Sequence, residues 1–104
     1  MASTVAASSL TSANAAGPGT TVDFLTAKKN VTAMIVPTTA LTGGLLHIEA
    51  SQDGTNWAVV RTIEVIGRSN YATHITGVAF RYWRANLAKD ATGGRLAVTF
   101  MEAD

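Results

Sequence analysis

The chain has 104 residues, a formal net charge of +1, no cysteine and only 14% charged side chains. This length suits one domain, and the missing cysteines exclude disulfides and cysteine-based metal or redox chemistry. The small net charge produces no strong field for nucleic acid, and no run approaches the ~20 apolar residues of a membrane span. Because proteins usually carry ~25% charged residues, we expect a second protein to cover part of the surface. A surface rich in Thr, Ser and Asn is the alternative.

Residues 1–20 differ in composition from the rest of the chain. They are almost entirely Ala, Ser, Thr, Gly, Val and Asn, carry no charged side chain and end in a Gly-Pro-Gly break. Such a segment has too few large apolar groups to offset the entropy of its own ordering. We therefore expect an extended arm held by a neighbouring subunit, with the contact residues Thr4, Val5, Leu10 and Pro18. An arm folded back on its own domain is the alternative.

From residue 21 the pattern changes to short alternating runs separated by turn residues. Alternation with β-branched and aromatic enrichment predicts strands. The predicted strands cover residues 21–25, 30–36, 44–51, 57–65, 71–75, 79–87 and 94–101. This spacing is typical of a sandwich or barrel, and the chain leaves no room for the crossover helices of a parallel sheet. We predict an all-β, antiparallel β-sandwich of jelly-roll or Ig-like type, with about seven strands in residues 21–104.

Two glycine pairs mark turns. Gly43-Gly44 and Gly93-Gly94 each follow a threonine and lie between two predicted strands. Because glycine tolerates the positive φ values that tight hairpins need, we predict hairpin turns in similar positions. A phosphate cradle would need a helix directly after the glycines, and no helical pattern follows them.

The most specific local feature is Ser51-Gln52-Asp53-Gly54-Thr55-Asn56-Trp57. Asp-Gly is a strong tight-turn signal. We expect the Asp53 carboxylate to accept backbone N–H groups and Gly54 to adopt the left-handed conformation. Trp57 would begin the next strand and bury its ring beneath the turn. These roles are structural and need no ligand.

Catalytic and metal-binding patterns are weak. After residue 20 the serines are Ser51 and Ser69, and the histidines are His47 and His74. Neither serine lies in a Gly-x-Ser-x-Gly elbow. His47 and Glu49 have the i, i+2 spacing that could share a metal ion, but a polar sheet face explains them as well. We predict no enzymatic activity, no cofactor and no metal.

Basic and aromatic residues alternate in residues 80–86. Arg81 and Arg84 flank Tyr82 and Trp83, a mixture that can stack bases and contact phosphates. Adjacent residues of a strand point to opposite faces, however. We therefore expect one aromatic ring in the core and no nucleic-acid partner.

The chain resembles small phage virion proteins. In that pattern an S-x-D-G-T-N-W/F hairpin precedes an R-Y-x-R-A-N strand and a T-G-G turn. The matching segments here are residues 51–57, 80–86 and 92–94, and the resemblance covers roughly residues 44–101. A weaker resemblance is to discoidin-like (coagulation factor 5/8 C-type) carbohydrate-binding domains, which are longer and often carry flanking cysteines.

The stronger resemblance implies a structural virion protein made in the host cytoplasm. We expect a capsid decoration (cement) protein on the capsid surface, bound to the major capsid protein and to neighbouring subunits. It implies a homo-oligomer, with a trimer suited to local three-fold positions. A tail or baseplate component is one alternative. The other is a carbohydrate-binding module for a host glycan, with an aromatic platform at Tyr71, Trp57 or Trp83.

Overall fold

The computed structural model describes residues 4–67 and 69–103, and all their regular secondary structure is β-strand. The described residues contain no helix long and apolar enough to cross a membrane. The strands are β1 (Thr4–Ala13), β2 (Gly17–Pro18), β3 (Val22–Lys28), β4 (Val31–Pro37), β5 (Gly43–Ser51), β6 (Ala58–Glu64), β7 (Tyr71–Ile75), β8 (Phe80–Thr92) and β9 (Leu96–Ala103).

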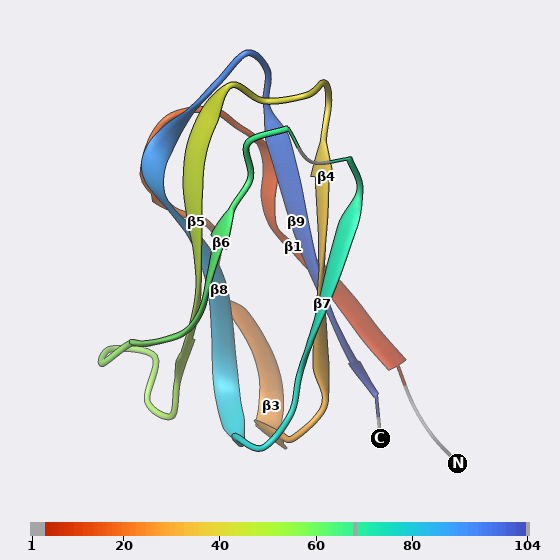
Figure 1. Ribbon diagram of the computed structural model, residues 1–104. Coiled ribbons are helices and arrows are strands. Elements are labelled where there is room, and N and C mark those ends of the chain that lie inside the picture. Colours follow the sequence, from red (N-terminus) through yellow and green to blue (C-terminus); the bar gives the residue numbers. More distant parts are fainter. Residues whose placement is uncertain (1–3, 68, 104) are drawn as a thin grey trace.

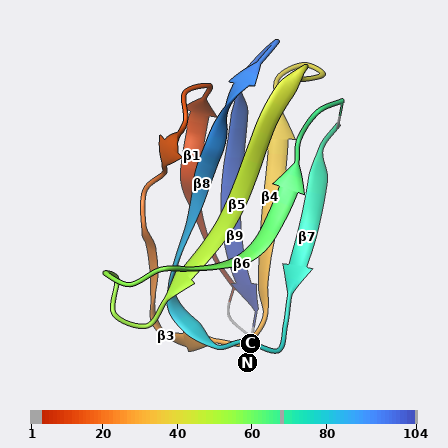
Figure 2. The ribbon, with the colours of Figure 1, turned by 60° about the vertical axis from the view of Figure 1, so that its left-hand side comes forward.

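The strands form two antiparallel sheets that pack face to face (Figures 1 and 2). One sheet has the order β1-β9-β4-β7, and the other has the order β2-β8-β5-β6. β3 also pairs with β8. Because β2 pairs with residues 86 and 87 of β8 and β3 with residues 80–83, the two act as one interrupted edge strand. We call the sheets the β9 sheet and the β8 sheet.

This strand order is that of a double-sheet jelly roll. The predicted all-β antiparallel sandwich is confirmed, and of the two sandwich types considered the structure has the jelly roll. The strands that follow one another in the chain repeatedly change sheet, as in the steps from β3 to β4, β4 to β5 and β8 to β9. Contacts between residues distant in sequence therefore hold the domain together.

The core lies between the sheets and follows the two-residue period of the strands. On β8 the inward side chains are Trp83, Ala85 and Leu87, all fully buried. The rings of Trp83 and of Phe100 on β9 lie 6.2 Å apart between their centroids, which joins the two sheets. Aliphatic side chains of β4 and β5 complete the core.

The N-terminal segment is a strand of the domain and not a separate arm. β1 pairs with β9 from Thr4 opposite Ala103 to Ala13 opposite Leu96. Leu10 is buried, with 8% of its surface exposed, and belongs to the core. The expected boundary at residue 20 is therefore wrong, and the alternative of a segment folded on its own domain is correct. Composition misled because backbone hydrogen bonds to β9 help to offset the ordering cost of a segment that has few apolar side chains.

Hydrogen bonds also attach the segment between β1 and β3 to the domain. The Ser9 hydroxyl donates to the Thr20 carbonyl at 2.7 Å and accepts the Ala85 N–H at 2.9 Å. Gly19 N–H donates to the Ala85 carbonyl at 2.7 Å. A Cβ at Gly19 would overlap the Ser9 carbonyl oxygen and the Leu10 side chain, so only glycine fits.

The two Thr-Gly-Gly triplets meet in space, and neither is a hairpin. Thr42 N–H donates to the Thr92 carbonyl at 2.8 Å, and the two threonine hydroxyl oxygens lie 3.0 Å apart. Each triplet connects strands of different sheets, β4 to β5 and β8 to β9. Gly44 and Gly93 have positive φ values of 145° and 87°. Gly93 and Gly94 lie between β8 and β9, whereas Gly43 and Gly44 are the first two residues of β5, where its register with β8 shifts. The predicted hairpins are not formed, because turn chemistry alone does not say which sheet the next strand joins.

Packing of β1 can be tested with Leu10→Ala. We expect the free energy of unfolding to fall by about 2–4 kcal/mol, because the change removes buried methyl groups and leaves a cavity. Urea denaturation measures this loss. The control is Thr11→Ser, an exposed position on the same strand, which should change the value by no more than about 0.5 kcal/mol. Equal effects of the two changes would mean that β1 is not packed on the core.

Candidate interaction surfaces

Hydrogen bonds to Asp53 close the loop of residues 51–57, which protrudes at the lower left of Figures 1 and 2. Asp53 Oδ1 accepts the backbone N–H groups of Thr55 and Asn56, both at 2.8 Å, and Oδ2 accepts the Asn56 side-chain amide at 2.8 Å. The Ser51 hydroxyl donates to Oδ1 at 2.9 Å. These donors, the Asn56 backbone N–H above all, hold the pKa of Asp53 well below its ordinary value. The ionised Asp53 carboxylate therefore closes the loop at neutral pH.

Trp57 lies outside the core, contrary to the expectation that its ring is buried beneath the turn. It is half-buried and immediately precedes β6. The Arg84 guanidinium lies over its ring, 4.2 Å from the centroid. Gly54 has a φ of 78°, and a Cβ built there would lie 3.6 Å from the nearest Tyr82 ring carbon. The loop thus rests on the outer face of the β8 sheet, so its tryptophan is covered by a surface arginine rather than by core residues.

Arg84 is fixed from its other side by Glu49. Its Nε donates to Glu49 Oε1 at 2.7 Å, and the Asn86 side-chain amide donates to Glu49 Oε2 at 3.0 Å. Glu49 is only 7% exposed, so the pair is partly desolvated. We call Glu49, Trp57, Arg84 and Asn86 the Arg84 cluster. Its aromatic and polar groups are held in place before any partner binds.

The second arginine of β8 is also paired. Arg81 forms two hydrogen bonds with the Asp23 carboxylate, at 2.7 and 2.9 Å. The pKa of Asp23 is lowered by this contact. Since Arg81 and Arg84 each face a carboxylate, neither presents an uncompensated positive charge to phosphate groups.

A recess of about 290 Å³ lies beside the 51–57 loop. It is lined by Ala50, Gln52, Asp53, Asn56, Trp57, Ala58 and Phe80. An indole ring next to side-chain amides and a carboxylate combines an apolar surface with hydrogen-bonding groups. These groups suit a polyhydroxyl ligand such as a sugar.

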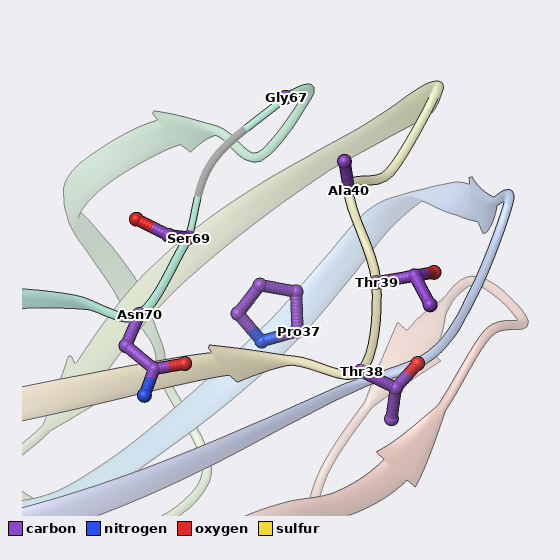
Figure 3. Close-up of a pocket in the computed structure, with 7 residues that line it drawn as sticks. All are labelled: Pro37, Thr38, Thr39, Ala40, Gly67, Ser69 and Asn70. Atoms are coloured by element: carbon purple, nitrogen blue, oxygen red, sulfur yellow. The ribbon is translucent and has the colours of Figure 1, made fainter.

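A larger recess, of about 480 Å³, lies where β4 ends, at the end of the sandwich opposite the 51–57 loop (Figure 1). Figure 3 shows it in close-up. It is lined by Pro37, Thr38, Thr39, Ala40, Gly67, Ser69 and Asn70. Figure 3 shows the Pro37 ring between Ser69 and Asn70 on one side and the two threonines on the other. The hydroxyls of Thr38 and Thr39 donate to the carbonyls of Arg95 and Gly93. These hydroxyls therefore hold the adjacent turn, and none of the lining side chains is an acid, a base or a histidine.

The two histidines do not converge on one site. His74 lies on the outer face of the β9 sheet, whereas His47 lies on the outer face of the β8 sheet. Ser51 bonds to Asp53 within the 51–57 loop, whereas His74 lies on β7 in the other sheet, so these three side chains form no catalytic triad. The described residues hold no group of three potential metal ligands from His, Cys, Asp and Glu.

The outer face of the β9 sheet carries no charged side chain among its described residues. We call it the uncharged face. The pairing register and the alternating burial place the following residues on it: Ser8, Thr32, Met34, Val36, Ala72, His74, Ala97, Thr99 and Met101. Three large apolar residues are exposed on its two central strands, Met34 (43%), Val36 (38%) and Met101 (45%). The outer face of the β8 sheet, by contrast, carries the paired charges described above.

The four residues expected to bind a partner lie in different settings. Leu10 is in the core and cannot contact another subunit. Pro18 is exposed on the short strand β2. Thr4 and Val5 pair with β9 through their backbones, and their side chains lie outside the described residues.

Comparisons with known proteins show a shared fold. No protein-family model and no curated protein sequence matches the chain. The crystal structure of the SPBc2 prophage-derived protein YomS is similar, with a TM-score of 0.75 and 10% identity, covering 100% of this chain and 96% of that chain.

Two larger proteins match in part. A glycoside hydrolase has a TM-score of 0.53 and 24% identity, covering 75% of this chain and 18% of that chain. A family two carbohydrate esterase from Cellvibrio japonicus has a TM-score of 0.52 and 10% identity, covering 99% of this chain and 34% of that chain. At such identities the likeness concerns the fold and not the activity.

The Asp53 hydrogen bonds predict a pH-dependent stability. Asp53→Asn removes the charge, so we expect a lower Tm than the wild type at pH 7. Because the pKa of Asp53 in the folded chain is lowered from 3.8, the contribution of the ionised carboxylate is present above pH 4 and is lost as the pH falls further. The difference in Tm should therefore shrink below about pH 4. A difference that stays constant from pH 7 to about pH 3 would contradict this role.

Proposed function

We propose that this chain is a structural protein of a phage particle, and specifically a capsid decoration protein that binds the major capsid protein lattice and stabilises the head. The uncharged face carries the proposal. Interface cores are depleted in charged residues and enriched in methionine, and this face has both properties on its described residues. A sheet face of this kind suits contact with protein better than contact with water.

The phage setting is supported by two likenesses. The 51–57 loop and the strand that contains Arg81 and Arg84 resemble segments of small phage virion proteins. YomS, which shares the fold over almost its whole length, is prophage-derived. Jelly rolls occur in viral capsid proteins and also in lectins, so the fold is compatible with the proposal without selecting it. A tail or baseplate component remains the closest rival.

The mechanism we propose is mechanical and includes no catalysis. β1 completes the sheet of its own domain, so we do not retain the idea of an arm that ties neighbouring subunits. The whole folded domain would instead sit on the shell and resist its opening by bridging adjacent capsid subunits. The proposal also involves no cofactor, nucleic acid or membrane.

Binding to particles tests the function. Purified chain added to phage heads that lack it should cosediment with them, saturate at a fixed ratio to the major capsid protein and raise the temperature at which the heads open. Imaging of the native particle then locates the chain. A position in the tail, or heads that neither bind the chain nor gain heat resistance, would overturn the decoration role.

The recess beside the 51–57 loop favours a second candidate function, binding of a carbohydrate. Of the three rings expected as a platform, Trp57 is the one that lines this recess, because Trp83 is fully buried and Tyr71 packs against the core. Gln52 and Asn56 line the same recess and can bond to sugar hydroxyls.

A glycan array with the purified chain tests the second candidate. We expect specific binding that is lost in Trp57→Ala and kept in Val59→Ala, a nearby exposed apolar residue that does not line the recess. A wild-type chain that binds no glycan, or a loss that is the same in both variants, would reject this function.

A further inference from the structure

We propose that the uncharged face binds a second copy of this chain, so that two jelly rolls pack through their β9 sheets about a two-fold axis. The inference rests on the proposed function and assigns the uncharged face to the contact between copies, which leaves the other surfaces of the dimer for the capsid. It rests on the chemistry of the face, on the charges of the opposite face and on the area available.

The centre of the face has the composition of an interface core. Met34 on β4 is paired with Thr99 on β9, and Met101 on β9 is paired with Thr32 on β4. The two methionines therefore lie on adjacent central strands, each beside a threonine. Methionine is flexible and adapts to an irregular opposing surface. The edge strands β1 and β7 add Ser8, Ala72 and His74, which gives the patch a small and mostly polar rim.

The lack of charged side chains on the described residues of this face favours a second copy of the same face as the partner. Two-fold symmetry places one surface patch against itself, and the described residues of this face bring no like charges together when it does so. A head-to-tail contact would place this face against another surface of the chain. The outer face of the β8 sheet presents Glu49 and Arg84, which would be desolvated further against a surface without charged partners.

The area is sufficient for a reversible dimer. Four strands about 4.8 Å apart give a width of about 19 Å, and eight residues of β9 at about 3.3 Å each give a length of about 26 Å. Two such faces together bury on the order of 1,000 Å², the lower limit for a specific interface. We therefore expect a dimer that dissociates on dilution, with the two sheets about 10 Å apart as in other sheet-on-sheet packings.

Sedimentation of the full chain tests the inference. The mass should rise from the monomer value of 10.8 kDa towards twice that value as the concentration increases from roughly 1 to 200 µM. Because the described residues of the face carry no charged side chain that could form an ion pair, the midpoint should change little between low and high salt.

Variants on the two outer faces locate the contact. Met34→Lys places a charge at the centre of the uncharged face, and we expect dimerisation to weaken at least about tenfold. The control is Thr62→Lys, the same charge at an exposed position on β6 in the other sheet, which should dimerise like the wild type. Thermal unfolding of both variants shows whether each is folded.

Each alternative outcome is decisive. A chain that stays monomeric throughout this range, or a mass of three times the monomer, overturns the two-fold dimer. Equal dimerisation of Met34→Lys and Thr62→Lys places the contact elsewhere. A strictly monomeric chain that still decorates heads refutes this inference and keeps the proposed function. A chain that dimerises as expected but does not bind heads supports this inference and refutes the proposed decoration function.

Discussion

The indole of Trp83 is the contact that joins the two sheets and sets the orientation of β8. The ring is fully buried, lies near Phe100 of the opposite sheet, and donates its N–H to the Phe80 carbonyl at 2.9 Å. That bond satisfies a donor that would otherwise be costly to bury. Because side chains alternate along a strand, fixing Trp83 inward turns Tyr82 and Arg84 outward. The support for the 51–57 loop and the Arg84 cluster depends on this alternation.

The two outer faces divide the chemistry of the molecule between them. On the β8 sheet, Arg84 and Glu49 form an ion pair, and Arg81 is paired with Asp23. Each charge is therefore compensated locally, while the group as a whole remains compatible with water. On the β9 sheet the described outward residues are hydroxyls, small side chains, methionine, valine and histidine. The chain has few charged side chains, and the described residues on the outer face of the β9 sheet carry none of them.

The local strand pattern was the most predictable part of the fold. Residues 44–51 and 71–75 were predicted as strands and correspond closely to β5 and β7. The run from residue 79 was also recognised, although β8 continues to Thr92. Of the interaction surfaces, the alternation of residues 80–86 could be seen in advance, because it follows from a two-residue period. The uncharged face could not, because its members come from four strands that lie far apart in the chain.

The sequence by itself determined the strand class, the turn at Asp53-Gly54, the break at Gly93-Gly94 between two strands, and the low content of charged side chains. Each depends on neighbouring residues or on composition alone. Only the tertiary structure decided that β1 completes the β9 sheet, that the two Thr-Gly-Gly triplets meet, and that Trp57 lies under an arginine on the surface. These features depend on which distant strands pair, and pairing is selected by the joint burial of both sheets rather than by any local preference.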